Sequence, residues 1–381
     1  NVNAFFATDI GLLNLALPLA ISFFTFQQIA YLVDSYKRET QEYDILNYLV
    51  FVSFFPQLIA GPIVHHKEMM PQFSYVRNKL VNYKNVTLGL FIFSIGLFKK
   101  AVIADTFAVW ATNGFDKAEI LNFFEAWATS LSYTFQIYFD FSGYTDMAIG
   151  IALLFNIRLP INFNSPYKAT NIKDFWRRWH ITLSRFLRDY IYIPLGGNRE
   201  GDFKTYNNLV ITFLIGGIWH GAGWTFMFWG LLHGVGLVVY QLWCRLGLRL
   251  SLWLAWLVTF LFINITWVFF RAETWSDAMK VLSGMCGFTT IIFPKQLQHY
   301  LSDLVSSDIL FVDGFLLNIG GGSDTIGWIV IAFIVVLFFK NSIEKLHNFK
   351  LNLFNFIFMV FTFSIAVLAV TRESEFLYFN F

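Results

Sequence analysis

Long apolar runs alternate with short polar stretches along nearly the whole chain. A run of about 20 apolar residues is long enough to cross the hydrocarbon core of a bilayer as a helix. Together with shorter, re-entrant pieces, the runs predict about eight to ten membrane-embedded segments. We expect them at Ile10–Val33, Ile45–Val64, Val86–Phe98 continuing at Ala101–Ala111, Leu121–Phe141 continuing at Met147–Phe155, Trp224–Trp243, Leu252–Phe270, Thr325–Phe339 and Leu353–Val370.

The stretch 209–243 departs from this pattern because it is rich in glycine as well as apolar. Each glycine in a helix interior costs roughly 1 kcal/mol relative to alanine. We therefore expect a short apolar approach over Leu209–Ile218, a break around His220 and a resumed helix over Trp224–Trp243. Backbone that is broken at membrane depth is tolerated only where protein or a water-filled cavity surrounds it.

His220 is the first candidate for a functional residue. It lies between Trp219 and Gly221 at the expected break, and an ionisable side chain at membrane depth is a functional candidate by default. His233 lies inside the resumed helix, where packing between helices and a functional role both remain open.

Basic residues are concentrated in the segment 162–204, which the positive-inside rule places at the cytoplasmic face. Apolar residues recur there at helical spacing from Ile172 to Tyr190, and Pro194 then ends the pattern. We expect an amphipathic helix that lies at the membrane surface. At 100° per residue His180 falls on the apolar side of this helix, near Trp176. Two roles are therefore open for His180: packing in the core, or a second polar anchor.

Other polar groups interrupt the apolar runs. The sequence DFSGYTD places Asp140 and Asp146 on either side of Tyr144, where they either line a polar passage or mark a capped helix end. Lys99 and Lys100 are expected to extend their amines to the membrane interface.

Two adjacent histidines, His65 and His66, follow the second expected span. Neighbouring side chains on a helix point to different faces, so we expect an interfacial loop here and no metal site in the chain. The cysteines, Cys244 and Cys286, make no zinc-binding pattern.

Composition excludes a soluble globular chain. Hydrophobic residues make up 56% of the 381 residues and charged residues 14%, about half the usual share. We read one membrane-embedded domain over 1–381, an all-α polytopic membrane protein. A net charge of +2 argues against nucleic acid as a partner. The chain begins with Asn1, so we expect it to be a fragment of a longer protein.

Several stretches resemble the membrane-bound O-acyltransferase family, and in particular its bacterial branch that O-acetylates alginate or peptidoglycan. The last two long motifs are the most specific to that family. The stretches are LPLAISFFTFQQIAYLVD from Leu17, FFPQLIAGPI from Phe54, YFDFSGYTDMAIG from Tyr138, FWRRWHITLSRFLRDYIYIPLGGNR from Phe175, GGIWHGAGWTFMFWGLLHG from Gly216 and FLYFNF from Phe376.

The resemblance implies a multi-helix core with re-entrant and amphipathic helices around a central tunnel. Members of the family usually have further spans before the motif at Leu17, which implies an N-terminally truncated chain. His220 matches the essential histidine of the family and His180 its second functional position.

By the same resemblance the activity is O-acetyl transfer across the bacterial cytoplasmic (inner) membrane. Acetyl-CoA is the donor substrate, no cofactor is held permanently, and the acetyl group goes to an extracytoplasmic partner protein or a polysaccharide. We expect His220 to be the general base, because a histidine titrates near neutral pH. For His180 three roles are open: it orients the donor, stabilises charge or assists proton movement.

The candidates for substrate contacts are Trp176, Arg177, Trp219, Asp140 and Tyr144. Arginines beside His180 are suited to CoA phosphates and equally to anionic lipid. A transporter or channel that uses intramembrane His and Asp is the main alternative, and a scaffold without catalysis is a third.

Overall fold

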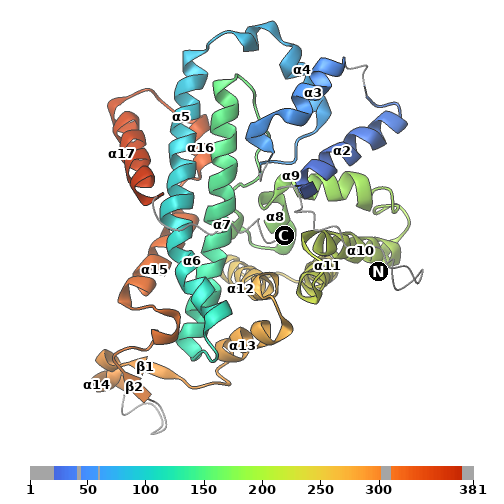
Figure 1. The fold of residues 1–381 in the computed structure, drawn as a ribbon. Helices are drawn as coiled ribbons and strands as arrows, with labels where there is room; N and C mark the ends of the chain where they lie inside the picture. Colours follow the sequence, from blue (N-terminus) through green and yellow to red (C-terminus); the bar gives the residue numbers. More distant parts are fainter. Residues whose placement is uncertain (1–20, 41–43, 59–60, 302–309, 371–381) are drawn as a thin grey trace, which may run out of the picture.

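The computed structural model describes residues 21–40, 44–58, 61–301 and 310–370. Within these ranges nearly all regular structure is helical, and the exception is a pair of three-residue strands (Figure 1). The strands β1 (Ile292–Pro294) and β2 (Leu310–Val312) run parallel, with Ile292 opposite Leu310.

Two long helices lie side by side through the molecule (Figure 1). The first has 35 residues over Tyr83–Lys117. It consists of α5 (Tyr83–Phe98), the π-helical turn η3 (Lys99–Ala104), α6 (Asp105–Thr112) and a last π-helical turn, η4 (Asn113–Lys117). The second is α7 (Phe123–Leu154), which has 32 residues and is buried over most of its length. Asn122 begins α7 with a capping box, because its side chain accepts from the Glu125 N–H and the Glu125 carboxylate accepts from the Asn122 N–H.

Glycines allow α5 and α7 to approach closely. A Cβ at Gly143 would lie 2.8 Å from the carbonyl oxygen of Gly96, and one at Gly150 would lie 2.7 Å from that of Gly89. Gly89 and Gly96 are seven residues apart in α5, and Gly143 and Gly150 are seven residues apart in α7. The two glycines of each helix therefore lie on one face of it. Small residues at such positions are typical of packed membrane helices.

Two expectations for these helices are wrong: a capped helix end at DFSGYTD, and lysine amines at the membrane interface. The alternative that the carboxylates line a polar passage stays a prediction. α7 passes through the sequence DFSGYTD without a break, so no helix end lies there. Lys99 is buried and its Nζ lies 2.7 Å from Asp146 Oδ2. Lys100 Nζ lies 2.6 Å from Asp140 Oδ1, so both amines pair with α7 instead of extending to the interface.

The N-terminal described helices are α2 (Ile21–Tyr36), α3 (Ile45–Ser53) and α4 (His66–Ser74). The first half of the expected span Ile10–Val33 lies outside the described residues, and α2 continues past Val33 to include Asp34. The expected span Ile45–Val64 is wrong: α3 ends at Ser53, and Pro56 stands in the short 3-10 turn that follows.

The expected amphipathic helix is two short helices, so that prediction is wrong. α8 (Ile172–Arg178) and α9 (Ile181–Leu187) are separated at Trp179 and His180, and the π-helical turn η6 (Arg188–Tyr192) follows α9. His180 takes φ 42° and ψ 55°, the left-handed region that a side chain with a Cβ seldom adopts. This turn directs the His180 side chain into the core instead of along a continuous helix stripe.

The expected break at His220 is confirmed. α10 (Asp202–His220) ends on the histidine, and α11 (Trp224–Arg245) begins four residues later. α12 (Leu252–Arg271) then follows close to the expected span. Gly221 to Gly223 form the connection between α10 and α11.

The other glycines of this stretch serve packing instead of breaking the helices. A Cβ at Gly230 would overlap the carbonyl oxygen of Phe213, and one at Gly234 would lie 2.8 Å from Val210 Cα. These positions bring α10 and α11 into direct backbone contact. The many glycines of this stretch are therefore explained by the close approach of α10 to α11. The sequence alone indicated only a kink in one helix.

The C-terminal part contains short elements and two further apolar helices, which lie at the spans predicted for Thr325–Phe339 and Leu353–Val370. They are α13 (Trp275–Met285), α14 (Gln298–Leu301), α15 (Ser323–Phe338), α16 (Ser342–His347) and α17 (Leu353–Ala369). Short 3-10 turns elsewhere are η1 (Phe55–Gln57), η2 (Val76–Lys79), η5 (Pro166–Lys168), η7 (Lys295–Leu297) and η8 (Leu317–Ile319).

Three helices of the described residues are long and apolar enough to cross a membrane: Tyr83–Lys117, Trp224–Arg245 and Leu252–Arg271. Three shorter apolar helices accompany them: Ile45–Gln57, Ser323–Phe338 and Leu353–Ala369. The predicted class, an all-α polytopic membrane protein, is confirmed by this helical content. The number of eight to ten embedded segments stays a prediction.

Candidate active site

His220 occupies the last position of α10, and its residue surface is 5% exposed. Aromatic rings from three elements surround it. The ring centroids of Trp219, Trp229 and Phe270 lie 4.6, 5.2 and 4.9 Å from that of the imidazole. Trp229 belongs to α11 and Phe270 to α12, so the break after His220 seats the imidazole between three helices.

His180 lies at the turn between α8 and α9 and is 1% exposed. Its Nδ1 lies 3.3 Å from Asn162 Oδ1, which can only accept, so this nitrogen carries the proton in the neutral ring. The same oxygen accepts from the Thr182 hydroxyl at 2.7 Å. His180 Nε2 is buried and has no hydrogen-bond partner among the described residues, so it presents a lone pair.

His180 and His220 line one small cavity. Its volume is about 10 Å³, close to the space that one water molecule needs. Seven of the nine lining residues are aromatic or histidine side chains, and they come from α8, the turn after it, and the helices α10, α11 and α12. The lining consists of Ile137, Trp176, Trp179, His180, Leu183, His220, Trp229, Trp267 and Phe270.

A second polar group lies in the cavity wall. The indole Nε1 of Trp229 is buried and has no hydrogen-bond partner in the described part of the chain. A buried N–H without a partner is costly, at about 1–3 kcal/mol. Together with His180 Nε2, it gives this small apolar space one donor and one acceptor that a bound molecule can satisfy.

Two more of the predicted residues, Trp176 and Trp219, lie at the wall of the site. Trp176 lines the cavity, and its Nε1–H donates to His233 Nδ1 at 3.1 Å. His233 is fully buried and is not part of the lining, so it holds the Trp176 wall instead of facing the cavity. Trp219 stacks on Phe26 of α2 with ring centroids 4.7 Å apart, which places it on the outer side of His220.

The structure places the other predicted contact residues away from the cavity. Asp140 is buried against Lys100, Tyr144 is partly buried on α7, and neither contributes to the lining. Arg177 is exposed on α8. His220, His180 and Trp176 therefore lie together at the cavity, with Trp219 adjacent. Asp140, Tyr144 and Arg177 lie outside this group.

The arginines near His180 differ in their partners. Arg185 forms a two-pronged ion pair with Glu68 of α4, and Arg178 pairs with Asp174 at 2.9 Å. Arg188 pairs with its neighbour Asp189. The choice between CoA phosphates and anionic lipid as their contacts stays open, but Arg185 has to leave Glu68 to meet either.

Three residues of this site carry no local sequence signal. Trp267 lies within an unbroken apolar run, and Asn162 lies in an irregular segment 18 residues before His180. Trp229 lies within the motif around His220, although its spacing does not reveal that it faces the histidine. These contacts join residues far apart in sequence, which periodicity along one helix cannot report.

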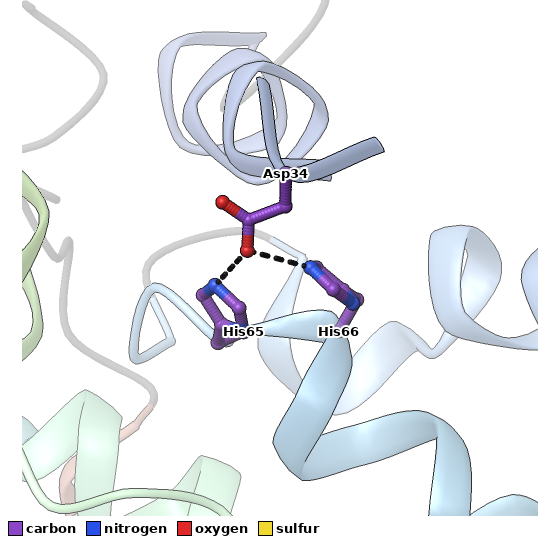
Figure 2. Close-up of side chains that lie close together, drawn as sticks. All are labelled: Asp34, His65 and His66. Carbon is purple, nitrogen blue, oxygen red and sulfur yellow. Dashed lines mark hydrogen bonds and ion pairs between the residues drawn. The ribbon is translucent and has the colours of Figure 1, made fainter. Parts of the chain in front are cut away.

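The prediction for His65 and His66 is wrong in its geometry. The two rings do not diverge: the Nε2 atoms lie 3.1 and 3.0 Å from the same oxygen, Oδ2 of Asp34 (Figure 2). His65 is the N-cap of α4 and His66 its first residue, so the pair begins a helix instead of lying in a loop.

Comparison with known proteins gives the family. The sequence model of the membrane-bound O-acyltransferase family matches residues 14–274, a range that contains His180 and His220. The chain is 50% identical to the peptidoglycan O-acetyltransferase of Helicobacter pylori, over the whole chain and 78% of that protein. It is 42% identical to a probable alginate O-acetylase of Pseudomonas aeruginosa, over 73% of the chain and 53% of that protein.

A more distant relative transfers a different acyl group. The teichoic acid D-alanyltransferase of Streptococcus thermophilus is 28% identical over 60% of the chain and 57% of its own length. The range matched by the family model covers more than half of the chain. The chain therefore belongs to the membrane-bound O-acyltransferase family and is an O-acyltransferase.

Proposed function

We propose that this protein transfers an acetyl group from cytoplasmic acetyl-CoA to a hydroxyl acceptor on the far side of the bacterial inner membrane, with His220 as the general base. The observation that carries the proposal is the cavity at the end of α10, where His220 and His180 face one enclosed space. That space lies within the range matched by the family.

The first step is proton removal from the acceptor. In this mechanism a ring nitrogen of His220 takes the proton as the hydroxyl oxygen attacks the thioester carbonyl carbon of acetyl-CoA. The C–S bond then breaks, the CoA thiolate leaves, and the His220 imidazolium returns the proton to give free CoA thiol. General acid–base catalysis of this kind typically contributes 10²–10⁴-fold to the rate.

The negative charge on the carbonyl oxygen needs a donor. We assign this role to the Trp229 indole N–H, which is buried beside His220 and lacks a partner among the described residues. A preorganised donor in a site without bulk water stabilises such an oxyanion more strongly than water does. His180 Nε2, with its lone pair, lines the same cavity and serves as an acceptor that positions the bound substrates, while the hydroxyl proton is directed at His220.

The acyl group and the acceptor are proposed from the relatives, and acetyl-CoA is proposed as the donor from the family resemblance. Acetyl transfer to peptidoglycan is supported by the 50% identity to the Helicobacter pylori protein over the entire chain, and an alginate-like polymer is the second candidate. We also propose an extracytoplasmic partner protein that passes the acetyl group on. Because the cavity holds about one water molecule, binding of the thioester has to widen it.

The test uses the purified protein in detergent with acetyl-CoA and a peptidoglycan glycan fragment as acceptor. Release of CoA thiol is followed with a thiol-reactive dye, and acetyl esters on the glycan are counted by mass spectrometry. The expected result is that His220→Gln lowers the rate of CoA release by about 10²–10⁴-fold. His347→Gln is the matched control, because His347 is an exposed histidine on α16.

A wild-type rate in His220→Gln would reject the role of the base. If wild-type protein released CoA with water alone and formed no acetyl ester, the proposed acceptor would be wrong. This result would not bear on the proposed role of His220 as the base. Loss of activity in both histidine variants would show that the effect is not specific to the cavity.

A further inference from the structure

We propose that Asp34, His65 and His66 form a binding site for one divalent transition-metal ion, of which Zn²⁺ is the best match. The site lies outside the cavity of His220 and does not depend on the proposed reaction. A ligand set of two imidazole nitrogens and one carboxylate oxygen is typical of Zn²⁺ and related ions, whereas Mg²⁺ and Ca²⁺ prefer oxygen alone.

The three ligand atoms converge on one point. His65 Nε2 and His66 Nε2 lie 3.1 and 3.0 Å from Asp34 Oδ2, and the ligand atoms all lie within 4.8 Å of one another (Figure 2). Ligands at about 2.0–2.1 Å from a tetrahedral zinc ion are separated by about 3.3 Å. Two of the three separations, 3.1 and 3.0 Å, are close to that value, and the third is no more than 4.8 Å.

Two elements fix this convergence. Asp34 lies in the last turns of α2, and the chain then returns so that His65 caps α4 and His66 begins it. The extended backbone at His65, with φ −104° and ψ 138°, turns its ring toward the same side as the His66 ring. Adjacent residues on a regular helix would diverge, so the helix start is what makes the pair convergent.

Tyr190 orients the carboxylate from a third element. Its hydroxyl donates to Asp34 Oδ1 at 3.0 Å and leaves Oδ2 directed at the histidines. The same hydroxyl lies 2.8 Å from His65 Nε2. Outer groups that hold metal ligands in this way typically contribute 10–100-fold to metal affinity.

Burial and access both suit a bound ion. Asp34 and His66 are 4% and 1% exposed, so the carboxylate lies where an unbalanced charge is costly. The His65 side chain is 20% exposed, which leaves one side of the site open to water as a fourth ligand.

Three existing contacts compete with the ion: two involve Lys67, and in the third the Tyr190 hydroxyl oxygen accepts from His65 Nε2–H. Lys67 Nζ lies 3.3 Å from Asp34 Oδ2, but it also lies 3.0 Å from Glu39, and the side chain is 42% exposed, so it can remain on Glu39 alone. The Lys67 N–H contacts His65 Nδ1 at 3.2 Å, which places the proton of the metal-free ring on Nε2. Ligation through Nε2 moves that proton to Nδ1, so His65 gives up its N-cap contact with the Lys67 N–H when the metal bond forms.

The site would fasten α2 to the wall of the catalytic cavity. Asp34 lies eight residues, or about 12 Å of helix, beyond Phe26. Phe26 stacks on Trp219 with centroids 4.7 Å apart, and Phe23 of the same helix stacks on His180 at 6.2 Å. A metal bond at Asp34 therefore holds in place the helix that contacts His180 and Trp219, the neighbour of His220.

The direct test is the metal content of the purified protein. The protein is prepared with a tag that contains no histidine, in a Cys244→Ser/Cys286→Ser background, because both thiols are exposed and free to bind zinc. Plasma mass spectrometry is done after preparation in medium with zinc, after chelation, and after dialysis against Zn²⁺. The expected result is about one ion per chain that chelation removes and Zn²⁺ restores.

Variants assign the ion to this site. Asp34→Asn and His66→Gln are expected to lose the ion, while His347→Gln, which changes an exposed histidine of α16, retains it. Tyr190→Phe is expected to weaken Zn²⁺ affinity by about 10–100-fold, and Lys67→Met to strengthen it by removing the competing amine. Wild-type protein without stoichiometric metal under all three conditions would overturn the proposal and leave a hydrogen-bonded cluster. Equal metal content in wild type and Asp34→Asn would also overturn it.

Discussion

Replacing Gly230 with alanine tests whether the close contact between α10 and α11 positions the site. The new Cβ would overlap the carbonyl oxygen of Phe213 and lie 3.2 Å from Gly217 Cα. These neighbours are backbone atoms, so no side chain can move away to make room. Gly230 directly follows Trp229, the aromatic wall beside His220.

The size of the effect follows from the overlap. Heavy atoms are in optimal contact at about 3.5 Å, so α10 and α11 have to separate by on the order of 1 Å. Overpacking of this kind costs about 1–3 kcal/mol of stability. A misplacement of about 1 Å in a catalytic site can reduce the rate by about 100-fold. We therefore expect a folded protein with a lower thermal midpoint and a much lower rate of acetyl transfer.

The assay compares Gly230→Ala with Gly327→Ala. A Cβ at Gly327 of α15 meets nothing within 4 Å, so this control gains helix propensity, about 1 kcal/mol, without a clash. Thermal midpoints in detergent and rates of CoA release are measured for both variants. A wild-type midpoint and rate in Gly230→Ala would refute the argument that backbone contact between these helices sets the cavity.

Three further predictions concern single side chains. Trp229→Phe keeps the ring but removes the N–H, so kcat should fall by about 10²–10³-fold with little change in KM for acetyl-CoA; an unchanged kcat would exclude the oxyanion role. Lys99→Met leaves the buried Asp146 without its counter-charge and should lower stability by about 3–5 kcal/mol, seen as a lower thermal midpoint, with partial recovery in Lys99→Met/Asp146→Leu. Asn162→Ala removes the acceptor that holds His180 Nδ1–H and should slow transfer by about 10- to 100-fold, and wild-type kinetics would show that this contact does not matter.

The sequence predicts those features that depend on neighbours along the chain. The break after His220 follows from Gly221 and Gly223, and the helices α12, α15 and α17 follow from apolar runs of the right length. The pairing of His220 with His180 at one site came from the family resemblance, since spacing alone left His180 open to a packing role. The cavity that both line is consistent with that pairing.

The sequence fails where the deciding contact comes from another helix. Two carboxylates in an apolar segment left the run DFSGYTD open to a polar passage or a capped helix end, but lysines from the neighbouring long helix balance both charges within a continuous helix. His65 and His66 looked divergent because the start of α4 and the position of Asp34 cannot be read from local spacing. In both cases the missing information was the identity of a partner more than 30 residues away.

We propose above all that His220, as the general base, is required for acetyl transfer from one side of the membrane to the other. Inside-out inner-membrane vesicles that contain the wild-type protein are given acetyl-CoA with a labelled acetyl group, and label held in the lumen as acetyl ester is counted after washing. We predict that label accumulates with the wild type and with His347→Gln, and that His220→Gln reduces it to the level of vesicles without the protein. Equal accumulation in His220→Gln and wild-type vesicles would contradict the account.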